Sequence, residues 1–451
     1  MTSNTPKTQS SSWSSIIREP AMSKLIANMA FNGLSYGVYN NLVMFFIIYL
    51  DPVNWYQDFA LYYLVFQITM SVALPIVGVL TDKIGRKPML IMGASVSALG
   101  MFILPVSTQW WHLLYSSALQ ATGFALLGTA QNCVIADVTE GYRREKGYSI
   151  TMSFSMVFSV IGTVALIIYS AIYQTLLPAN TYYQLPLLAS AVLALIAAIP
   201  MFLISISRRP RESSLQDSKS RKDLELPGPK ELGTKNHKQL YKPPSSIWRN
   251  GVVIKMIAFQ GIIGFGAGFL VPVFNYYWSA IFPVQQYVIY TIALLGELGT
   301  AMGGLAAPWI AKRAKRLGRV GTTVTCQFAS IACAAYLAVV PYFRVLLPAV
   351  IAFIARQALM NMVNPLMGAM TMDHTPETKR GRVNSLTQLA FNVPNGISPY
   401  LSEPLANSVP HGYGYTYSAL VLISTYITAT ALLSTTRKRD KLMVLQSRRG
   451  K

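Results

Sequence analysis

Charged residues are scarce in this chain. Asp, Glu, Lys and Arg make up 12% of its 451 residues, whereas 52% are hydrophobic. Since a soluble globular domain is about 25% charged, the composition excludes an ordinary soluble protein. The apolar residues gather in runs of roughly 20 residues or more, long enough to cross about 30 Å of hydrocarbon as helices.

Cysteine and histidine are also rare. The three cysteines, Cys133, Cys326 and Cys333, all fall in apolar runs. Cys326 and Cys333 are separated by about 10 Å on a helix, too far for a disulfide. The four histidines lack the spacing of metal ligands, and no glycine-rich nucleotide loop follows a strand. We therefore expect no disulfide, metal or cofactor, and no enzymatic activity.

Acidic residues are few beside the basic ones: 17 against 38, a net charge of +21. In a soluble protein this excess would indicate nucleic acid, but no aromatic and basic recognition module accompanies it. Instead, 35 of the 38 cations fall in or directly beside the two tails and the loops on one side of the apolar runs. That asymmetry predicts that both termini are cytoplasmic, with membrane lipid as a partner and no nucleic acid.

The apolar runs predict an all-α membrane protein with twelve transmembrane helices in two six-helix halves. The helices are expected near 22–50, 57–80, 88–106, 111–136, 148–174, 183–207, 252–282, 286–310, 318–340, 345–372, 383–404 and 413–436. A basic, proline-containing stretch separates the halves and is typical of a linker. The expected organisation is a cytoplasmic tail (1–21), an N-terminal bundle (22–207), a cytoplasmic linker (208–250), a C-terminal bundle (251–436) and a second cytoplasmic tail (437–451).

A dense charged segment joins the second and third runs with the pattern G-x3-D-K-x-G-R-K. Its defining residues are Gly78, Asp82, Lys83, Gly85, Arg86 and Lys87. Acidic and basic residues recur after run four (Asp137 to Arg144) and after run ten (Asp373 to Arg382). In spacing, charge order and position the segment resembles the loop motif of the major facilitator superfamily.

The resemblance implies a carrier that works by alternating access, usually as a monomer. In that family the matching acid contacts the start of span eleven and a basic residue after span four. The resemblance therefore implies that Asp82 lies near Val383–Ser385 and near Arg143 or Arg144. The sequence departs from the family's drug/proton antiporters, because residues 113–128 contain no arginine and residues 148–174 no proline.

Amide and tyrosine side chains recur at four-residue intervals in span one, so they form one stripe on the helix. Such a stripe faces protein or water, because amides facing lipid lose their hydrogen bonds. Interhelical bonding and a substrate cavity are the two interpretations, and the set as a whole favours the cavity. Amides also gather in spans four, seven and ten, which the resemblance places around a central cavity, whereas spans three, six, nine and twelve face outward. The predicted cavity residues are Asn28, Asn32, Tyr36, Asn40, Gln120, Gln131, Asn132, Gln260, Asn275, Gln357, Asn361 and Asn364.

Two ionisable residues, Glu297 and Arg356, fall about 17 Å into their predicted spans, near the middle of the bilayer. Buried charges there mark a pathway or a structural pair. We consider both a Glu297–Arg356 pair that opens and closes with substrate or protons and a static pair. Two further patterns, Gly264-x3-Gly268 and Gly299-x3-Gly303, predict close helix packing.

These features predict a carrier of the cell membrane for a small organic solute, coupled to protons, with export of amphiphilic or organic compounds as the leading interpretation. Uptake of a polar nutrient, such as a sugar or an organic acid, is the first alternative. A receptor that kept the carrier fold without transport is the second. No catalytic grouping supports a membrane-embedded enzyme.

Overall fold

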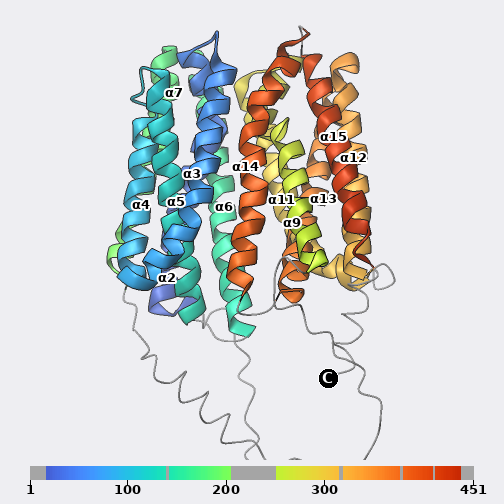
Figure 1. The fold of residues 1–451 in the computed structure, drawn as a ribbon. Helices are drawn as coiled ribbons and strands as arrows, with labels where there is room; N and C mark the ends of the chain where they lie inside the picture. The colour runs from blue at the N-terminus through green and yellow to red at the C-terminus, as the bar shows by residue number, and fades with distance from the viewer. Residues whose placement is uncertain are drawn as a thin grey trace, which may run out of the picture.

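The computed structural model describes residues 17–138, 142–204, 250–313, 318–375, 379–409 and 412–437. Helices account for nearly all of these residues, and they contain no strand (Figure 1). The N-half holds α2 (Pro20–Leu50), α3 (Trp55–Ile84), α4 (Arg86–Ile103), α5 (Trp110–Val138), α6 (Tyr142–Tyr173) and α7 (Ala179–Phe202). The C-half holds α9 (Gly251–Gly268), η2 (Val271–Val273), α10 (Phe274–Ile281), α11 (Gln286–Arg313), α12 (Gly318–Phe343), α13 (Leu346–Asp373), α14 (Arg380–Asn407) and α15 (Gly414–Ser434). The prediction of twelve spans in two six-helix halves is confirmed.

The helices run antiparallel, so the bundle has two distinct ends. We call the end where α2 begins and α15 stops the terminal end, and the opposite end the distal end (Figure 1). Nine of the described helical segments are long and apolar enough to cross a membrane. The other three are α4, whose 18 residues include Arg86 and Lys87, and α5 and α14, which are rich in Ser, Thr, Asn and Gln.

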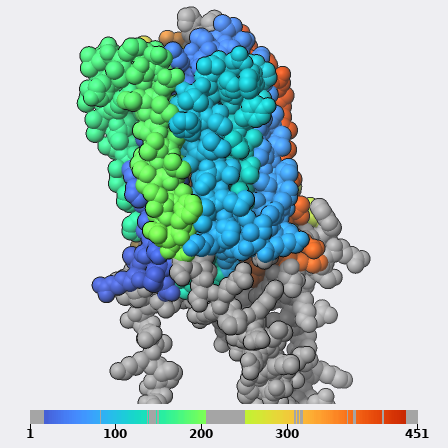
Figure 2. All heavy atoms as spheres, turned by 90° about the vertical axis from the view of Figure 1, so that its left-hand side faces the viewer, coloured from blue at the N-terminus to red at the C-terminus, as the bar shows by residue number. Residues whose placement is uncertain are grey.

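The two halves repeat one packing scheme. In the N-half α2 packs on α6 and α7, and α5 on α3 and α4; in the C-half α9 packs on α14 and α15, and α13 on α11 and α12. Helices α4 and α7 lie side by side on the outer face of the N-half (Figure 2), as α12 and α15 do in the C-half. Two seams join the halves, α3 with α14 and α6 with α11, and they correspond to each other in the repeat.

The predicted single span at 252–282 is interrupted in the structure. Helix α9 stops at Gly268, a short 3-10 turn follows, and α10 restarts at Phe274. Pro272 lies in the first positions of that turn, where its missing N–H costs least. Sequence hydropathy cannot register such a break, because the residues around it are as apolar as the helices on either side. The break places four residues on the wall of the cavity between the halves: Val271, Pro272, Phe274 and Asn275.

Glycines set the closest helix contacts, as their spacing predicts. A Cβ on Gly264 would meet the backbone of Phe391, and one on Gly268 would lie 2.5 Å from the carbonyl oxygen of Asn395, so α9 approaches α14 closely. Gly303 makes a similar approach to the backbone of α13. These contacts hold the helices of the C-half together as a tightly packed unit.

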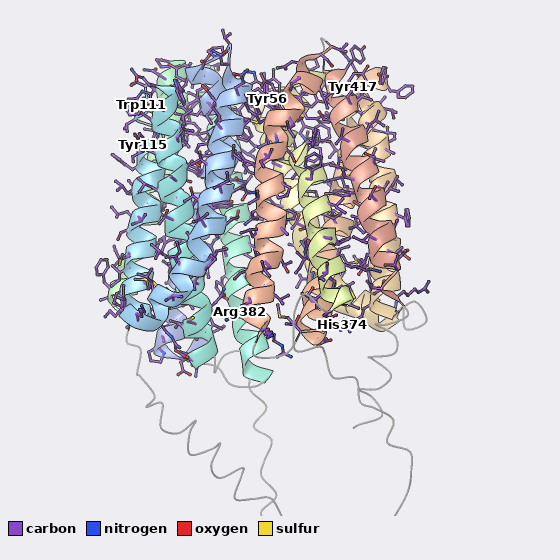
Figure 3. The ribbon with its side chains drawn as sticks, in the orientation of Figure 1. Tyr56, Trp111, Tyr115, His374, Arg382 and Tyr417 are labelled. Carbon is purple, nitrogen blue, oxygen red and sulfur yellow. The ribbon has the colours of Figure 1, made fainter. Side chains whose placement is uncertain are left out.

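The side chains at the two ends differ in kind. Exposed aromatic residues such as Trp111, Tyr115 and Tyr417 gather toward the distal end, where aromatic rings suit a membrane–water boundary (Figure 3). His374 and Arg382 lie at the terminal end in the same view. The two ends of the bundle thus differ chemically.

Candidate functional site

A cavity of about 840 Å³ lies between the two halves. Eight helical segments line it: α2, α3, α5 and α6 from the N-half, and η2, α10, α11 and α13 from the C-half. None of its described lining residues comes from α4, α7, α12 or α15. The expected outward placement of spans three, six, nine and twelve is therefore confirmed.

Aromatic rings, aliphatic side chains and polar groups share the cavity wall. Its aromatic members are Tyr36, Tyr39, Phe59, Tyr62, Tyr63, Phe66, Phe124, Phe274 and Phe353. Its polar members are Asn40, Asn41, Gln67, Gln120, Ser155, Ser159, Asn275, Thr300, Gln357 and one carboxylate, Glu297. Among the described lining residues Glu297 is the only charged one, so it is the group of this wall that can attract a cation electrostatically.

Five of the twelve predicted cavity residues line this cavity: Tyr36, Asn40, Gln120, Asn275 and Gln357. The other seven are absent from its wall in this conformation: Asn28, Asn32, Gln131, Asn132, Gln260, Asn361 and Asn364. For several of them the interhelical interpretation holds. The Asn28 amide donates to the carbonyl oxygen of Ala197 at 2.6 Å and accepts from Gln131 at 2.8 Å. The Asn361 amide donates to Thr300 at 3.1 Å.

Most of the cavity wall could not be predicted from the sequence. Tyrosines and phenylalanines of α3 and α5 look in sequence like lipid-facing or core residues, so they gave no signal. Asn41 and Gln67 were available signals, because each is an amide inside an apolar run. Gln120 organises the aromatic side: its amide donates to the hydroxyls of Tyr39 at 2.5 Å and Tyr62 at 3.3 Å.

Glu297 joins the two halves across the cavity. From α11 its carboxylate accepts hydrogen bonds from Asn41 of α2 at 3.5 Å and from Thr163 of α6 at 3.4 Å. Asn275 of α10 donates to the Asn41 side-chain oxygen at 3.4 Å and closes the group. These hydrogen bonds are long, and Asn41, Asn275 and Glu297 also line the cavity, so a solute there can replace them at low cost.

Arg356 does not face Glu297 in this conformation. Its side chain is 1% exposed, its Nη1 donates to Gln357 at 3.0 Å, and its guanidinium lies 5.3 Å from the ring centroid of Phe274. Its Nε and Nη2 have no hydrogen-bond partner among the described residues. The ion pairs formed by described side chains are Arg86–Asp137 and Arg319–Asp373, so the structure shows no Glu297–Arg356 pair. Gln357 and Phe274 belong to the cavity wall and separate the guanidinium from it.

Replacing Arg356 by methionine is expected to preserve or raise stability. A buried cation without a carboxylate partner loses more by desolvation than it gains, and apolar replacements of similar volume are neutral or stabilising by about 1–4 kcal/mol. The melting temperature of the purified protein measures the change. Arg319→Met is the control, because it removes a partly exposed, paired cation worth about 0–1 kcal/mol. A marked loss of stability in Arg356→Met alone would contradict this reading of the site.

The halves are closed over the cavity on the distal side. Tyr56 hydrogen-bonds Ser402 at 3.0 Å, and the Gln57 amide donates to Glu403 at 3.1 Å (Tyr56 is labelled in Figure 3). Beside the other seam, Tyr182 of α7 donates to Gln286 of α11 at 3.0 Å. Nearer the middle, Tyr63 and Gln67 donate to the Asn395 side-chain oxygen at 2.7 and 2.8 Å. The hydrogen bonds that join described side chains of the two halves all lie in the distal part or at the level of the cavity.

Asn395→Ala is expected to loosen this closure. It removes the acceptor of two bonds between the halves, and at about 1 kcal/mol each their loss shifts the equilibrium toward distal opening roughly 30-fold. Spin labels at Val53 and Ser408, in a chain whose three cysteines are replaced by alanine, report the distance across the distal end. Thr416→Ala is the control, because its hydroxyl bonds Ala338 within the C-half. An unchanged distance distribution in Asn395→Ala would contradict the role given to this contact.

The charged motif is helical for most of its length. Helix α3 continues to Ile84, which places Asp82 in its last turn, and the chain turns at Gly85 with φ of +101°, a conformation that favours glycine. Gly78 has open space around it rather than a close backbone neighbour. Lys83 and Lys87 are exposed. The side chains of Asp82, Arg143 and Arg144 lie outside the described residues, so their expected contacts remain predictions.

Arg86 of the motif pairs with Asp137 at the end of α5. The C-half repeats this arrangement, because Arg319 near the start of α12 pairs with Asp373 at the end of α13 at 2.5 Å. The acidic residues that follow spans four and ten, recognised in the sequence as an echo, thus have equivalent partners. Each pair ties two helices of one half together at the terminal end.

Comparison with known proteins agrees with this geometry. The family model described as Major Facilitator Superfamily matches residues 25–399, most of the chain. The chain therefore belongs to the major facilitator superfamily: it is a membrane-embedded transporter and not an enzyme.

Several curated relatives match part of the chain, among them the following two. The multidrug resistance protein MdtH of Sodalis glossinidius is 32% identical over 139 residues, which are 30% of this chain and 32% of that protein. The inner membrane transport protein YajR of Escherichia coli K12 is 33% identical over 84 residues, 18% of each chain. This chain thus spans about a third or less of the length of these relatives.

Solved structures match over nearly the whole chain at low identity. A D-xylose–proton symporter superposes with a TM-score of 0.70 at 12% identity, covering 91% of this chain and 96% of that one. The nucleoside transporter NupG gives 0.68 at 9% identity, covering 92% and 98%. At such identities the likeness shows the fold alone.

Proposed function

We propose that this chain exports a small amphiphilic organic compound from the cell by proton-coupled alternating access. The observation that carries the proposal is the cavity between the halves, closed on the distal side and lined by rings around one carboxylate. Its volume of about 840 Å³ lies within the usual range of roughly 300–1,000 Å³ for small-molecule sites. The partial match to proteins named for multidrug resistance supports the choice of cargo.

In this proposal Glu297 exchanges a proton for substrate. An ionised carboxylate attracts a cationic or polar group of the solute, whereas protonation removes that attraction and releases it. Because Asn41 and Thr163 bind the same carboxylate from the N-half, the occupant of the site also changes how the halves are held together. Coupling requires this differential interaction of the ligand with the two conformations.

The orientation and assembly follow from charge and family. The one-sided distribution of cations supports a cytoplasmic terminal end, so the present conformation opens inward. In the opposite conformation we propose that Asp82 contacts Val383–Ser385 together with Arg143 or Arg144, and that Gly78 gains the neighbour it lacks here. The chain acts as a monomer in the cell membrane, since each copy contains a complete cavity.

Counterflow in proteoliposomes tests the transport claim. The test compound is a lipophilic cation such as tetraphenylphosphonium. Proteoliposomes preloaded with the unlabelled cation should accumulate the labelled cation from outside. This accumulation should exceed that of protein-free liposomes by at least tenfold. Uptake of a polar nutrient is the second candidate, favoured by the amides Asn40, Asn41 and Gln120 in the wall. Counterflow of a sugar or organic acid, but not of the cation, would select it. Specific binding without counterflow would indicate a receptor.

A further inference from the structure

The cavity reaches the lipid-facing surface of the bundle beside α6. Val157 and Ile161 of α6 line it, and they are 56% and 46% exposed. They continue the exposed stripe of Val164, Ile168 and Ile172 on the same face of α6. Because these residues recur at intervals of three and four, they share one side of the helix, and that side points away from the partner α2.

The facing helix α11 shows the same feature. Leu298 borders the cavity, is 40% exposed, and belongs to the lipid-facing stripe Leu298, Met302 and Leu305. It directly follows Glu297, whose carboxylate lies inside. Side chains on both sides of the α6–α11 seam therefore touch the cavity and the outer surface at once.

The equivalent seam between α3 and α14 is sealed. The exposed stripe of α3 (Ile68, Val72, Ile76 and Val79) borders no part of the cavity, and no described residue of α14 lines it. There Tyr63 and Gln67 hydrogen-bond Asn395, and a Cβ on Gly396 would lie 2.9 Å from that of Gln67. The two seams occupy equivalent positions in the internal repeat. The side chains of each seam, and not the arrangement of the helices, therefore decide which seam borders the cavity.

We infer that the α6–α11 seam is a lateral portal through which an amphiphilic monocation enters the cavity from the membrane leaflet on the terminal side. The inference rests on the proposed function and specifies the source and charge of its substrate. Leu298 and Ile161 lie about 18 Å from the distal ends of their helices, near the middle of the bilayer, and Val157 lies one turn closer to the terminal end.

The chemistry at the portal fits such a substrate. An amphiphilic cation partitions into a leaflet with its apolar part among the acyl chains, so it meets the bundle already oriented. Leu298, Val157 and the flexible side chain of Met156 offer it an apolar passage. Inside, the Glu297 carboxylate and the faces of the surrounding rings are the groups that attract a positive charge. A hydrophilic solute has no reason to use this route.

The portal is tested by blocking it with bulk. Val157→Trp with Leu298→Trp fills the opening from both helices and leaves Glu297 and its hydrogen-bond donors in place. Ile76→Trp with Leu389→Trp is the matched control, because it adds the same bulk at exposed apolar positions of α3 and α14 that do not border the cavity. Tetraphenylphosphonium counterflow should fall at least tenfold in the first variant and stay within twofold of the unmodified chain in the second.

A second measurement reads the portal without transport. A phospholipid with a photoreactive diazirine in its acyl chain cannot enter through water, so any label inside the cavity arrives sideways. Mass spectrometry should find the label at Glu297 in the unmodified chain. Labelling of Glu297 should be at least fivefold lower in the double variant Val157→Trp with Leu298→Trp. Labelling of the lipid-facing Leu305 should be the same in both chains. No label at Glu297, or equal labelling in both chains, would overturn the portal. Blockable labelling without tetraphenylphosphonium counterflow would support the portal and overturn the proposed export.

Discussion

Glu297→Gln is expected to abolish proton-driven transport while the protein still reaches the membrane. Glutamine keeps the shape of the side chain and an oxygen for Asn41 and Thr163, but it cannot ionise. Accumulation of tetraphenylphosphonium driven by a pH gradient should fall at least 100-fold, to the level of protein-free liposomes. Counterflow, which needs no proton movement, should persist at a reduced rate.

The pH dependence separates coupling from a structural role. In the unmodified chain binding of an organic cation should strengthen as pH rises, because loss of a proton from Glu297 creates the charge that attracts it. In Glu297→Gln binding should be weaker and independent of pH. Glu403→Gln is the matched control, since Glu403 accepts from Gln57 at the distal end, away from the cavity. Unchanged pH dependence in Glu297→Gln would reject the coupling role.

Gly303→Ala is expected to destabilise the C-half, whereas Gly304→Ala is expected to preserve its stability or raise it slightly. A Cβ at position 303 would collide with the backbone carbonyl of Ala358 on α13, which cannot rotate away, whereas a Cβ at position 304 meets nothing within 4 Å. Overpacking of this kind costs about 1–3 kcal/mol. The melting temperatures of the two purified variants give the comparison.

The pair is closely matched, because both substitutions add one methyl group at adjacent positions of one helix. Any intrinsic preference of the helix for alanine over glycine favours both variants equally. Equal melting temperatures for Gly303→Ala and the unmodified chain would show that α11 and α13 are not packed as closely as described. A loss of transport in Gly304→Ala without a loss of stability would instead indicate that this space fills in another conformation.

Sequence reasoning predicted the fold well because the bilayer constrains it strongly. Apolar length defines each span, and the cations in the loops define which loops share a side. The break at Gly268–Pro272 escaped prediction, because a short non-helical turn buried in protein keeps the hydropathy of the helix around it.

The cavity was only partly predictable from sequence. Periodic amides identify helix faces that avoid lipid, but they do not tell a cavity from a helix contact: Asn40 lines the cavity, whereas Asn28, on the same stripe, bonds the backbone of α7. The rings of Tyr62 and Phe124 become a wall only when α3 and α5 meet. Glu297 was identified because a carboxylate within a span is rare, but its hydrogen bonds to α2 and α6 depend on the way the halves pack together.

Paired distance measurements across both ends of the bundle test the alternating movement of the halves most directly. One chain carries spin labels at Val53 and Ser408 on the distal side, and another at Ile84 and Asn384 on the terminal side, all exposed positions. When pH and the transported cation are varied, the distal distance should lengthen as the terminal distance shortens. Two distances that stay fixed, or that lengthen together, under conditions that support transport would contradict this movement.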